Sequence, residues 1–423
     1  MAHDDAHHED AHHGHDAPKI TADRVALPAG HPLRRLLPVG GAVGALALVA
    51  TFALGLGHPH ELYSSYLLAF FYWLTLALGG LFFVLLQFAT RAGWSVVVRR
   101  VAEHVSGTLP LFALLFVPLA LAVGQLYHWS EAGAMDHDPL LAGKAPYLNE
   151  GFFITRGVFF VLAWSLLGWW FRRRSMAQDT SHDPGATRFL QSASAPALIV
   201  FAVTLTFASF DWVMSLDPHW YSTIFGVYIF AGCAVAIFSL VSLLSMALEK
   251  GGGSKSGGPS GGPLAGLVTV EHYHDLGKLL FGFVVFWAYI AFSQFMLIWY
   301  SNIPEETVWY RHRLEHGWKA VTILLAVTHF AIPFFYLILR RTKRNRPLLA
   351  IGCLWMLAVH WLDLFWLIKP AVGAGPMPTL LDLLAFLGTG GLFLATLAWL
   401  MRKPATVPVG DPRLAESLSF ENM

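Results

Sequence analysis

The sequence predicts an all-α membrane protein with ten transmembrane helices. Apolar residues make up 56% of the 423 residues and charged residues only 13%, whereas charged residues are about 25% of an ordinary soluble domain. Ten apolar runs are long enough to cross about 30 Å of hydrocarbon. Lys and Arg gather in the connections on one side of these runs. Because so few charges cannot cover a soluble protein of this size, the excess apolar surface is expected to face lipid.

The ten apolar runs give the expected helices by residue number. They cover 37–56, 65–89, 108–127, 151–171, 195–214, 221–248, 277–300, 316–340, 348–369 and 379–401. The first 36 residues are polar, and no small-residue cleavage signature follows the first run. We therefore expect no cleaved signal peptide.

The distribution of basic residues predicts the orientation. With both termini in the cytoplasm, 22 of the 28 Lys and Arg residues fall on the cytoplasmic side, as the positive-inside rule requires. The six that remain on the outer side are Lys144, Arg156, Arg311, Arg313, Lys319 and Lys369. Ten helices with both termini cytoplasmic are the topology that this distribution favours.

An internal repeat groups eight of the helices. The second and sixth helices are entered at Tyr63-Ser64-Ser65 and Tyr221-Ser222-Thr223, and the third and seventh are preceded by His104-Val105-Ser106-Gly107 and His274-Asp275-Leu276-Gly277. The fourth and eighth helices each end in an arginine cluster, at Arg172 and Arg340. The fifth and ninth carry Asp211 and Asp363. Since the second and sixth helices run in the same direction, the repeat is parallel. It predicts two four-helix bundles, helices 2–5 and 6–9, with two peripheral helices.

These patterns divide the chain into six segments. They are a His-rich cytoplasmic tail (1–36), a peripheral helix with an outer loop (37–64), the first bundle (65–220), the second bundle (221–370) with a Gly-rich cytoplasmic linker (249–268), a second peripheral helix (371–401) and a cytoplasmic C-terminal tail (402–423). Six histidines in residues 1–16 could bind Zn²⁺ or Ni²⁺. A solvated tail with no metal is the favoured interpretation.

Ionisable side chains at bilayer depth are the candidate functional residues, because a charged group there costs about 3 kcal/mol. The candidates for a proton path are Asp211, Asp363, His360 and His329 within the helices, and His104, His274, Asp275 and Lys278 at the inner helix ends. Imidazoles and carboxylates at successive depths can pass protons along with intervening water. The alternative is that these groups only hydrogen bond between helices and stabilise packing.

Charge and cysteine content exclude several functions. A formal net charge of +1 gives no electrostatic basis for nucleic-acid binding. The two cysteines, Cys233 and Cys353, both lie inside apolar runs. They cannot form a disulfide framework, a cysteine-ligated iron–sulfur cluster or a CxxCH haem attachment. We therefore expect that this chain holds no redox cofactor through cysteine.

Five stretches resemble the ActF subunits of bacterial alternative complex III. They are KAPYLNEGFFITR (144–156), SFDWVMSLDPHWYSTIFGVYIFAG (209–232), HDLGKLLFGFVVFWAYIAFSQFMLIWYSNIPEET (274–307), WLDLFWLIKP (361–370) and DPRLAESLSFEN (411–422). Together they cover parts of helices 4 to 9 and the final tail, and the stretch 274–307 is the most specific. The His-rich tail and the Gly-rich linker have no counterpart in this resemblance.

The resemblance implies a fold and a role. ActF subunits belong to the NrfD/PsrC-like polytopic membrane proteins, with two four-helix bundles and two flanking helices. Such a complex oxidises a quinol and passes electrons to a cytochrome c or a terminal oxidase in the bacterial cytoplasmic (inner) membrane. Its iron–sulfur clusters and c-type haems lie on partner subunits, beside a quinol-binding NrfD-like sister subunit. The ActF subunit binds no redox cofactor and is proposed to provide part of a proton-translocation route.

The resemblance places Asp211, Asp363 and the run from His274 to Lys278 at matching positions, whereas His329 is a candidate only through its depth. Two other functions stay open. The chain could be a stand-alone proton-coupled transporter, although the repeat is parallel rather than inverted. It could also be a quinone-binding membrane anchor of a related oxidoreductase.

Overall fold

The computed structural model describes residues 20–251 and 261–422. The histidines of residues 1–16 and residues 252–260 of the Gly-rich linker lie outside these residues. Within the described ranges the regular elements are helices, apart from one isolated bridge between Ala26 and Ala405. Ten of the described helices are long and apolar enough to cross a membrane, which confirms the predicted helical membrane architecture.

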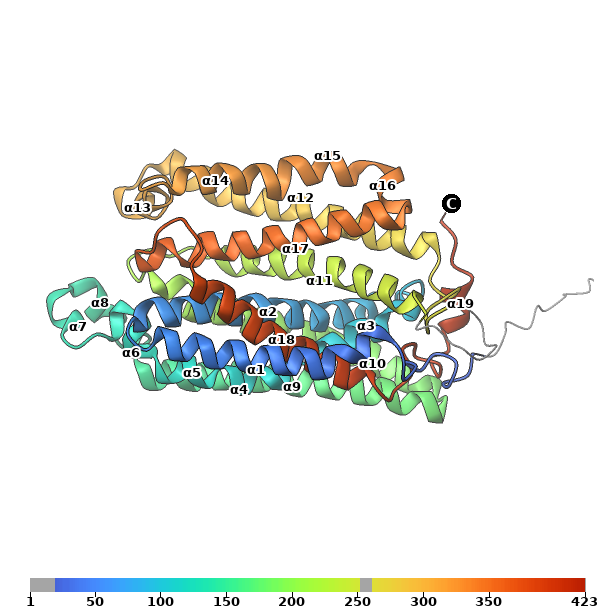
Figure 1. Cartoon of the computed structure of the whole chain (residues 1–423). Coiled ribbons are helices and arrows are strands. Elements are labelled where there is room, and N and C mark those ends of the chain that lie inside the picture. The colour runs from blue at the N-terminus through green and yellow to red at the C-terminus, as the bar shows by residue number, and fades with distance from the viewer. Residues whose placement is uncertain (1–19, 252–260, 423) are drawn as a thin grey trace, which may run out of the picture.

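The long helices run side by side in one stack (Figure 1). They are α1 (Leu36–Gly55), α2 (Pro59–Ala89), α3 (Val96–Ser106) continued by α4 (Leu109–Leu115) and α5 (Val117–Leu121), α9 (Glu150–Ser181), α10 (Pro184–Trp212), α11 (Phe225–Glu249), α12 (Val270–Ser301), α14 (Trp318–Ala326) with α15 (Ile332–Ile338), α17 (Arg346–Ile368) and α18 (Leu380–Met401). Helix α2 packs against α3, α4, α9 and α10, and α11 packs against α12 and α17. Helices α2 and α11 also pack on each other at the centre, and α18 joins α1 to α2.

The two ends of the stack differ in what they hold. We call one the terminal end, because both terminal segments lie there. Thr406 donates to the carbonyl of Val25, and Asn422 donates to Asp275 near the start of α12. The opposite end, the loop end, holds the short helices α6 (Val123–Leu126), α7 (Ala134–His137), α8 (Pro139–Lys144) and α13 (Pro304–His312) (Figure 1).

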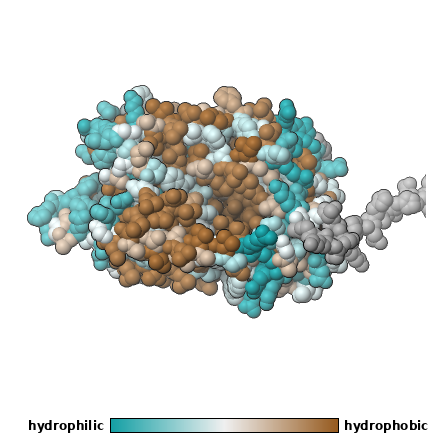
Figure 2. All heavy atoms as spheres, viewed as in Figure 1, coloured by the Kyte–Doolittle hydropathy of each residue, from teal (hydrophilic) through white to brown (hydrophobic). Residues whose placement is uncertain are grey.

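Apolar residues occupy much of the middle of the face shown in Figure 2, and hydrophilic residues gather at both ends. Large apolar side chains of the ten spans are exposed, among them Leu46, Leu121 and Phe335 at 71–80%. Contiguous apolar surface of this extent is unfavourable in water and favourable against lipid chains. The surface therefore fits a multi-pass membrane protein.

The expected bounds of the third helix are wrong. The helix begins at Val96, twelve residues before the expected start at 108, so His104 lies inside α3 and not before it. Arg99 and Arg100 continue the helix while buried, because Glu103, Asp179 and Asp411 neutralise them. Helix α12 likewise begins at Val270, which places His274, Asp275 and Lys278 in its first turns.

Two helices are interrupted near prolines. The third span breaks into α3, α4 and α5, with Pro118 at the start of α5. In the eighth span a π-helical segment, Val327–Ala331, separates α14 from α15, whose second residue is Pro333. Proline has no N–H to donate to the preceding turn, and such π segments are frequent at functional sites. His329 lies within this segment.

The close packing of α1 on α18 depends on glycine. A Cβ atom on Gly44 would lie 2.7 Å from the backbone nitrogen of Leu392, whereas one on the adjacent-turn Gly41 would meet only the Ala395 Cβ, at 3.9 Å. Small residues at such contacts let membrane helices approach closely. The α1–α18 contact therefore excludes a larger side chain at position 44.

We expect Gly44→Val to lower the free energy of unfolding by about 1–3 kcal/mol, because overpacking forces the two helices apart. Thermal unfolding of the purified protein in detergent measures the effect. Gly41→Val is the matched control, since it changes helix propensity equally without entering the contact. Equal midpoints for the two variants would contradict the proposed role of Gly44.

Candidate functional site

The Asp363 centre is a group of polar side chains buried near the loop end, where α2, α11, α12 and α17 meet. Asp363 lies five residues before the end of α17 and is 1% exposed. Its Oδ1 accepts a hydrogen bond from the Tyr228 hydroxyl of α11, and its Oδ2 accepts one from Trp287 Nε1 of α12 at 3.1 Å. Both donors are neutral, and no Lys or Arg pairs with this carboxylate in the described ranges.

Two buried histidines complete the Asp363 centre. The imidazole of His329 stacks on the indole of Trp287, with ring centroids 3.6 Å apart and planes inclined by 17°. Its two ring nitrogens have no hydrogen-bond partner among the described residues. His360, one turn before Asp363 on α17, contacts Thr75 Oγ1 of α2 through Nε2 at 2.8 Å. Because Thr75 donates its own proton to the carbonyl of Tyr72, His360 Nε2 must be the donor, which leaves Nδ1 without a proton or partner.

This arrangement is suited to exchanging protons. A buried carboxylate hydrogen bonded only to neutral groups lacks the fixed positive charge that would keep it ionised. An imidazole whose ring nitrogens are free can accept a proton and release it on the other side. Gly232 of α11 provides space for this chemistry, since a Cβ there would lie 2.8 Å from Cε1 of His360.

Asp211 is buried in a different environment, although the repeat pairs it with Asp363. Its carboxylate receives two hydrogen bonds from Arg156 of α9, Nε to Oδ2 at 2.7 Å and Nη2 to Oδ1 at 3.0 Å. The guanidinium lies over the rings of Tyr147 and Phe152, 3.9 and 4.1 Å from their centroids. A buried bidentate ion pair holds both charges in place. The structure therefore favours a packing role for Asp211.

Other buried cations at the loop end also have partners. Lys369 Nζ lies 2.7 Å from Asp382 Oδ1 of α18 and 2.9 Å from Ser65 Oγ of α2. Arg313, which follows α13, donates to the carbonyls of Trp366 and Leu367 at the end of α17. Burial lowers the pKa of Arg313 to about 9, so its guanidinium is charged at neutral pH. These contacts fasten the ends of α17 and α18.

The candidates at the terminal end are separate from the Asp363 centre. His104 is fully buried in α3 and accepts from Arg172 Nε at 3.3 Å. Asp275 pairs with Lys278 at 2.5 Å and accepts from Asn422 of the C-terminal tail at 2.9 Å, and His274 lies beside them on α12. The structure brings His329, His360 and Asp363 together, and leaves Asp211 and these four residues apart from them.

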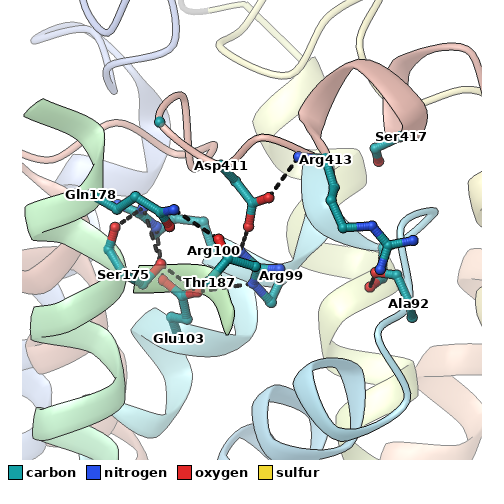
Figure 3. A network of polar contacts seen from close by, with 12 residues as sticks. Ala92, Arg99, Arg100, Glu103, Ser175, Gln178, Thr187, Asp411, Arg413 and Ser417 are labelled. Carbon is teal, nitrogen blue, oxygen red and sulfur yellow. Dashed lines mark hydrogen bonds and ion pairs between the residues drawn. The ribbon is translucent and has the colours of Figure 1, made fainter. Parts of the chain in front are cut away.

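A buried charge network ties the C-terminal tail to the terminal end (Figure 3). Arg99 binds Asp411 at 2.5 Å and Glu103 at 3.3 Å, and Arg100 binds Glu103 and Asp179, both at 2.8 Å. Ser175 of α9 donates to the same Glu103 carboxylate. Each of the two arginines thus pairs with two of the three carboxylates, and the network joins α3, α9 and the tail.

Sequence reasoning missed the partners of the candidate residues. Tyr228, Trp287 and Thr75 define the Asp363 centre, but in the sequence they resemble ordinary residues of apolar helices. The sequence identifies Arg156 as one of the outer basic residues but does not indicate its partner, Asp211. Among the described residues, no three His, Cys, Asp or Glu side chains come close enough to hold a metal ion.

We expect Asp211→Asn to lower the free energy of unfolding by about 3 kcal/mol, because Arg156 would be left buried without its counter-charge. Asp363→Asn makes the same chemical change at a similar depth and should cost only about 1 kcal/mol, since it removes no ion pair. Thermal unfolding of both variants in detergent compares them. Equal losses would show that the two carboxylates have equivalent environments after all.

The charge network predicts how the C-terminal tail is held. Asp411→Ala leaves Arg99 without its tail partner, so residues 411–420 should exchange backbone hydrogen for deuterium at least about tenfold faster. Mass-spectrometric hydrogen exchange of the detergent-solubilised protein measures this rate. Glu421→Ala removes the same charge from an exposed position of the same tail, where the described residues form no ion pair with it, and should leave exchange unchanged. Similar acceleration in both variants would rule out the network as the anchor.

No family model matches this chain, and no curated protein matches it either.

Proposed function

We propose that this chain is an integral membrane subunit of a quinol:electron-acceptor oxidoreductase complex, and that it provides part of a proton-translocation route. In this proposal the acceptor is a cytochrome c or a terminal oxidase, and the chain itself carries out no redox step. The observation that carries the proton-handling role is the Asp363 centre. A buried carboxylate with neutral donors lies there in the same cluster as two histidines whose ring nitrogens are partly or wholly free.

Membership of the complex is supported by the five stretches that resemble ActF subunits of alternative complex III. One of them, 361–370, contains Asp363, and another, 209–232, contains Tyr228, its hydrogen-bond donor. A third, 274–307, contains Trp287, the second donor. The resemblance therefore covers three of the helices that form the centre.

The geometry supports a route through the centre of the protein. Asp363 lies five residues before the loop end of α17, which is about 7 Å by helical rise. His360 hydrogen bonds to Thr75 on α2, and His329 lies in the π segment of the eighth span. These groups need intervening water to pass protons over the full depth.

We also propose how the helices are grouped into bundles and oriented in the membrane. The packing of α2 with α3, α4, α9 and α10, and of α11 with α12 and α17, supports two bundles related by a parallel repeat. In this topology the terminal end faces the cytoplasm of a bacterium and the chain lies in the inner membrane. Partner subunits carry the c-type haems and iron–sulfur clusters, and a quinol-binding NrfD-like sister subunit supplies the protons.

Purification of the tagged chain from its native membrane in mild detergent tests the assembly. We expect haem-containing and iron–sulfur subunits to elute with it, and to oxidise a quinol. Elution as a single monodisperse chain without these subunits would contradict the proposal and favour a stand-alone proton-coupled transporter.

Asp363→Asn tests the proton route in that purified complex. In proteoliposomes with a pH-sensitive dye, we expect the transfer of protons across the membrane per electron to fall about tenfold or more, because an amide cannot take up and release the proton. The protons that quinol oxidation itself liberates are still released where the quinol is oxidised. Asp363→Glu should restore part of the transfer. Asp136→Asn, the same change at an exposed position of the loop end, should have no effect. Unchanged proton transfer in the assembled Asp363→Asn complex would return Asp363 to a packing role.

A further inference from the structure

A groove at the terminal end lies between α4, α9 and α18 and is unrelated to the Asp363 centre. Its volume is about 470 Å³. Three cations line it, Arg172 of α9 and Arg402 and Lys403 directly after α18. Apolar and aromatic side chains form the remaining wall, among them Leu111 and Trp399. We call this site the basic groove.

The cations of the basic groove have unused binding capacity. Arg402 and Lys403 are exposed, and neither side chain forms an ion pair in the described ranges. Arg172 donates to His104 through Nε at 3.3 Å and to the carbonyl of Leu400 through Nη2 at 3.1 Å. These two contacts fix the guanidinium at the groove without neutralising its charge.

No carboxylate lines the basic groove. Glu103, on the turn of α3 that precedes the groove, has both oxygens occupied by Arg99, Arg100 and Ser175. Glu103 attracts Arg172 but is shared with Arg99 and Arg100. Since Arg402 and Lys403 have no carboxylate partner in the described ranges, the groove keeps an excess of positive charge. An anionic group is the complementary ligand.

The position of the basic groove indicates that its ligand also has an apolar part. The candidate span of α18 ends at Met401, immediately before Arg402. Trp169 and Trp399, exposed by 48% and 53%, lie at the same level, where amphipathic indoles mark the boundary between lipid chains and headgroups. Leu114 of α4 is 71% exposed further along the third span. A ligand here meets cations at one end and lipid-facing surface at the other.

We propose that the basic groove binds an anionic phospholipid. Its phosphate lies among Arg172, Arg402 and Lys403, and its acyl chains follow the exposed apolar surfaces of α4 and α18. A free phosphate would satisfy the cations but would leave the apolar wall without a partner. The site does not depend on the proposed proton route, because none of its cations belongs to the Asp363 centre.

Native mass spectrometry of the delipidated full chain in detergent tests this site. The probes are dioleoyl phosphatidylglycerol and dioleoyl phosphatidylcholine, which share acyl chains and differ in net charge. We expect the phosphatidylglycerol to bind about tenfold more tightly. The double variant Arg402→Gln/Lys403→Gln should abolish this preference while the unfolding temperature stays unchanged, because both side chains are exposed.

Arg340→Gln/Arg341→Gln is the matched control. It removes two exposed arginines at the same end of the molecule but outside the basic groove, and it should keep the preference. Equal binding of the two lipids to the unmodified chain would overturn the proposal, as would an equal loss in both double variants. Displacement of the phosphatidylglycerol by millimolar glycerol phosphate would also overturn it, because the acyl chains would then contribute nothing.

Discussion

The cost of keeping a charge out of water is the constraint on which the rest of this structure depends. Arg156 pairs with Asp211, Lys369 with Asp382, and Arg99 with Asp411. Each pair joins two different helices or segments, and a buried ion left alone would cost several kcal/mol. The pairs therefore fix which helices can lie next to each other. Apolar packing alone would be less selective, since lipid chains are as apolar as the helices.

The carboxylate of Asp363 differs from these paired groups, because no Lys or Arg of the described ranges pairs with it, and this difference points to its function. Its donors Tyr228 and Trp287 are neutral, whereas Asp211, its counterpart in the predicted repeat, holds an arginine in a bidentate pair. The two positions thus share the residue type while their surroundings differ. An ion pair resists protonation, but a carboxyl group among neutral donors can change its charge at a smaller cost. The two positions consequently differ in what they can do, although the sequence pairs them.

The sequence predicts the part of the fold that follows from local composition. Ten apolar runs give ten spans because the thickness of the bilayer fixes the length of each helix. Helix ends were less predictable where distant residues decide them. The third span begins at Val96 because Asp411, 312 residues from Arg99, neutralises that arginine, and Asp179 neutralises Arg100. For the site, Asp363, His360 and His329 could be identified as ionisable residues at depth. Tyr228, Trp287 and Thr75 could not, because only the packing of α2, α11 and α12 shows which of many similar side chains reach them.

Burial also changes how much each basic residue indicates about the orientation of the chain in the membrane. Six of them fall at the loop end, and sequence counting treats all six as opposing the cytoplasmic placement of the termini. Arg156, Arg313 and Lys369 are at most 9% exposed and bind carboxylates or carbonyls of neighbouring helices. A cation used in packing says little about the side of the membrane, because its position follows from its partner.

Lys144, Arg311 and Lys319 then remain as loop-end cations that weigh against the charge of the terminal end. The basic groove, with Arg402 and Lys403 unpaired in the described ranges, adds to the terminal-end charge that anionic headgroups attract. The asymmetry that supports cytoplasmic termini is therefore stronger among accessible residues than in the whole sequence.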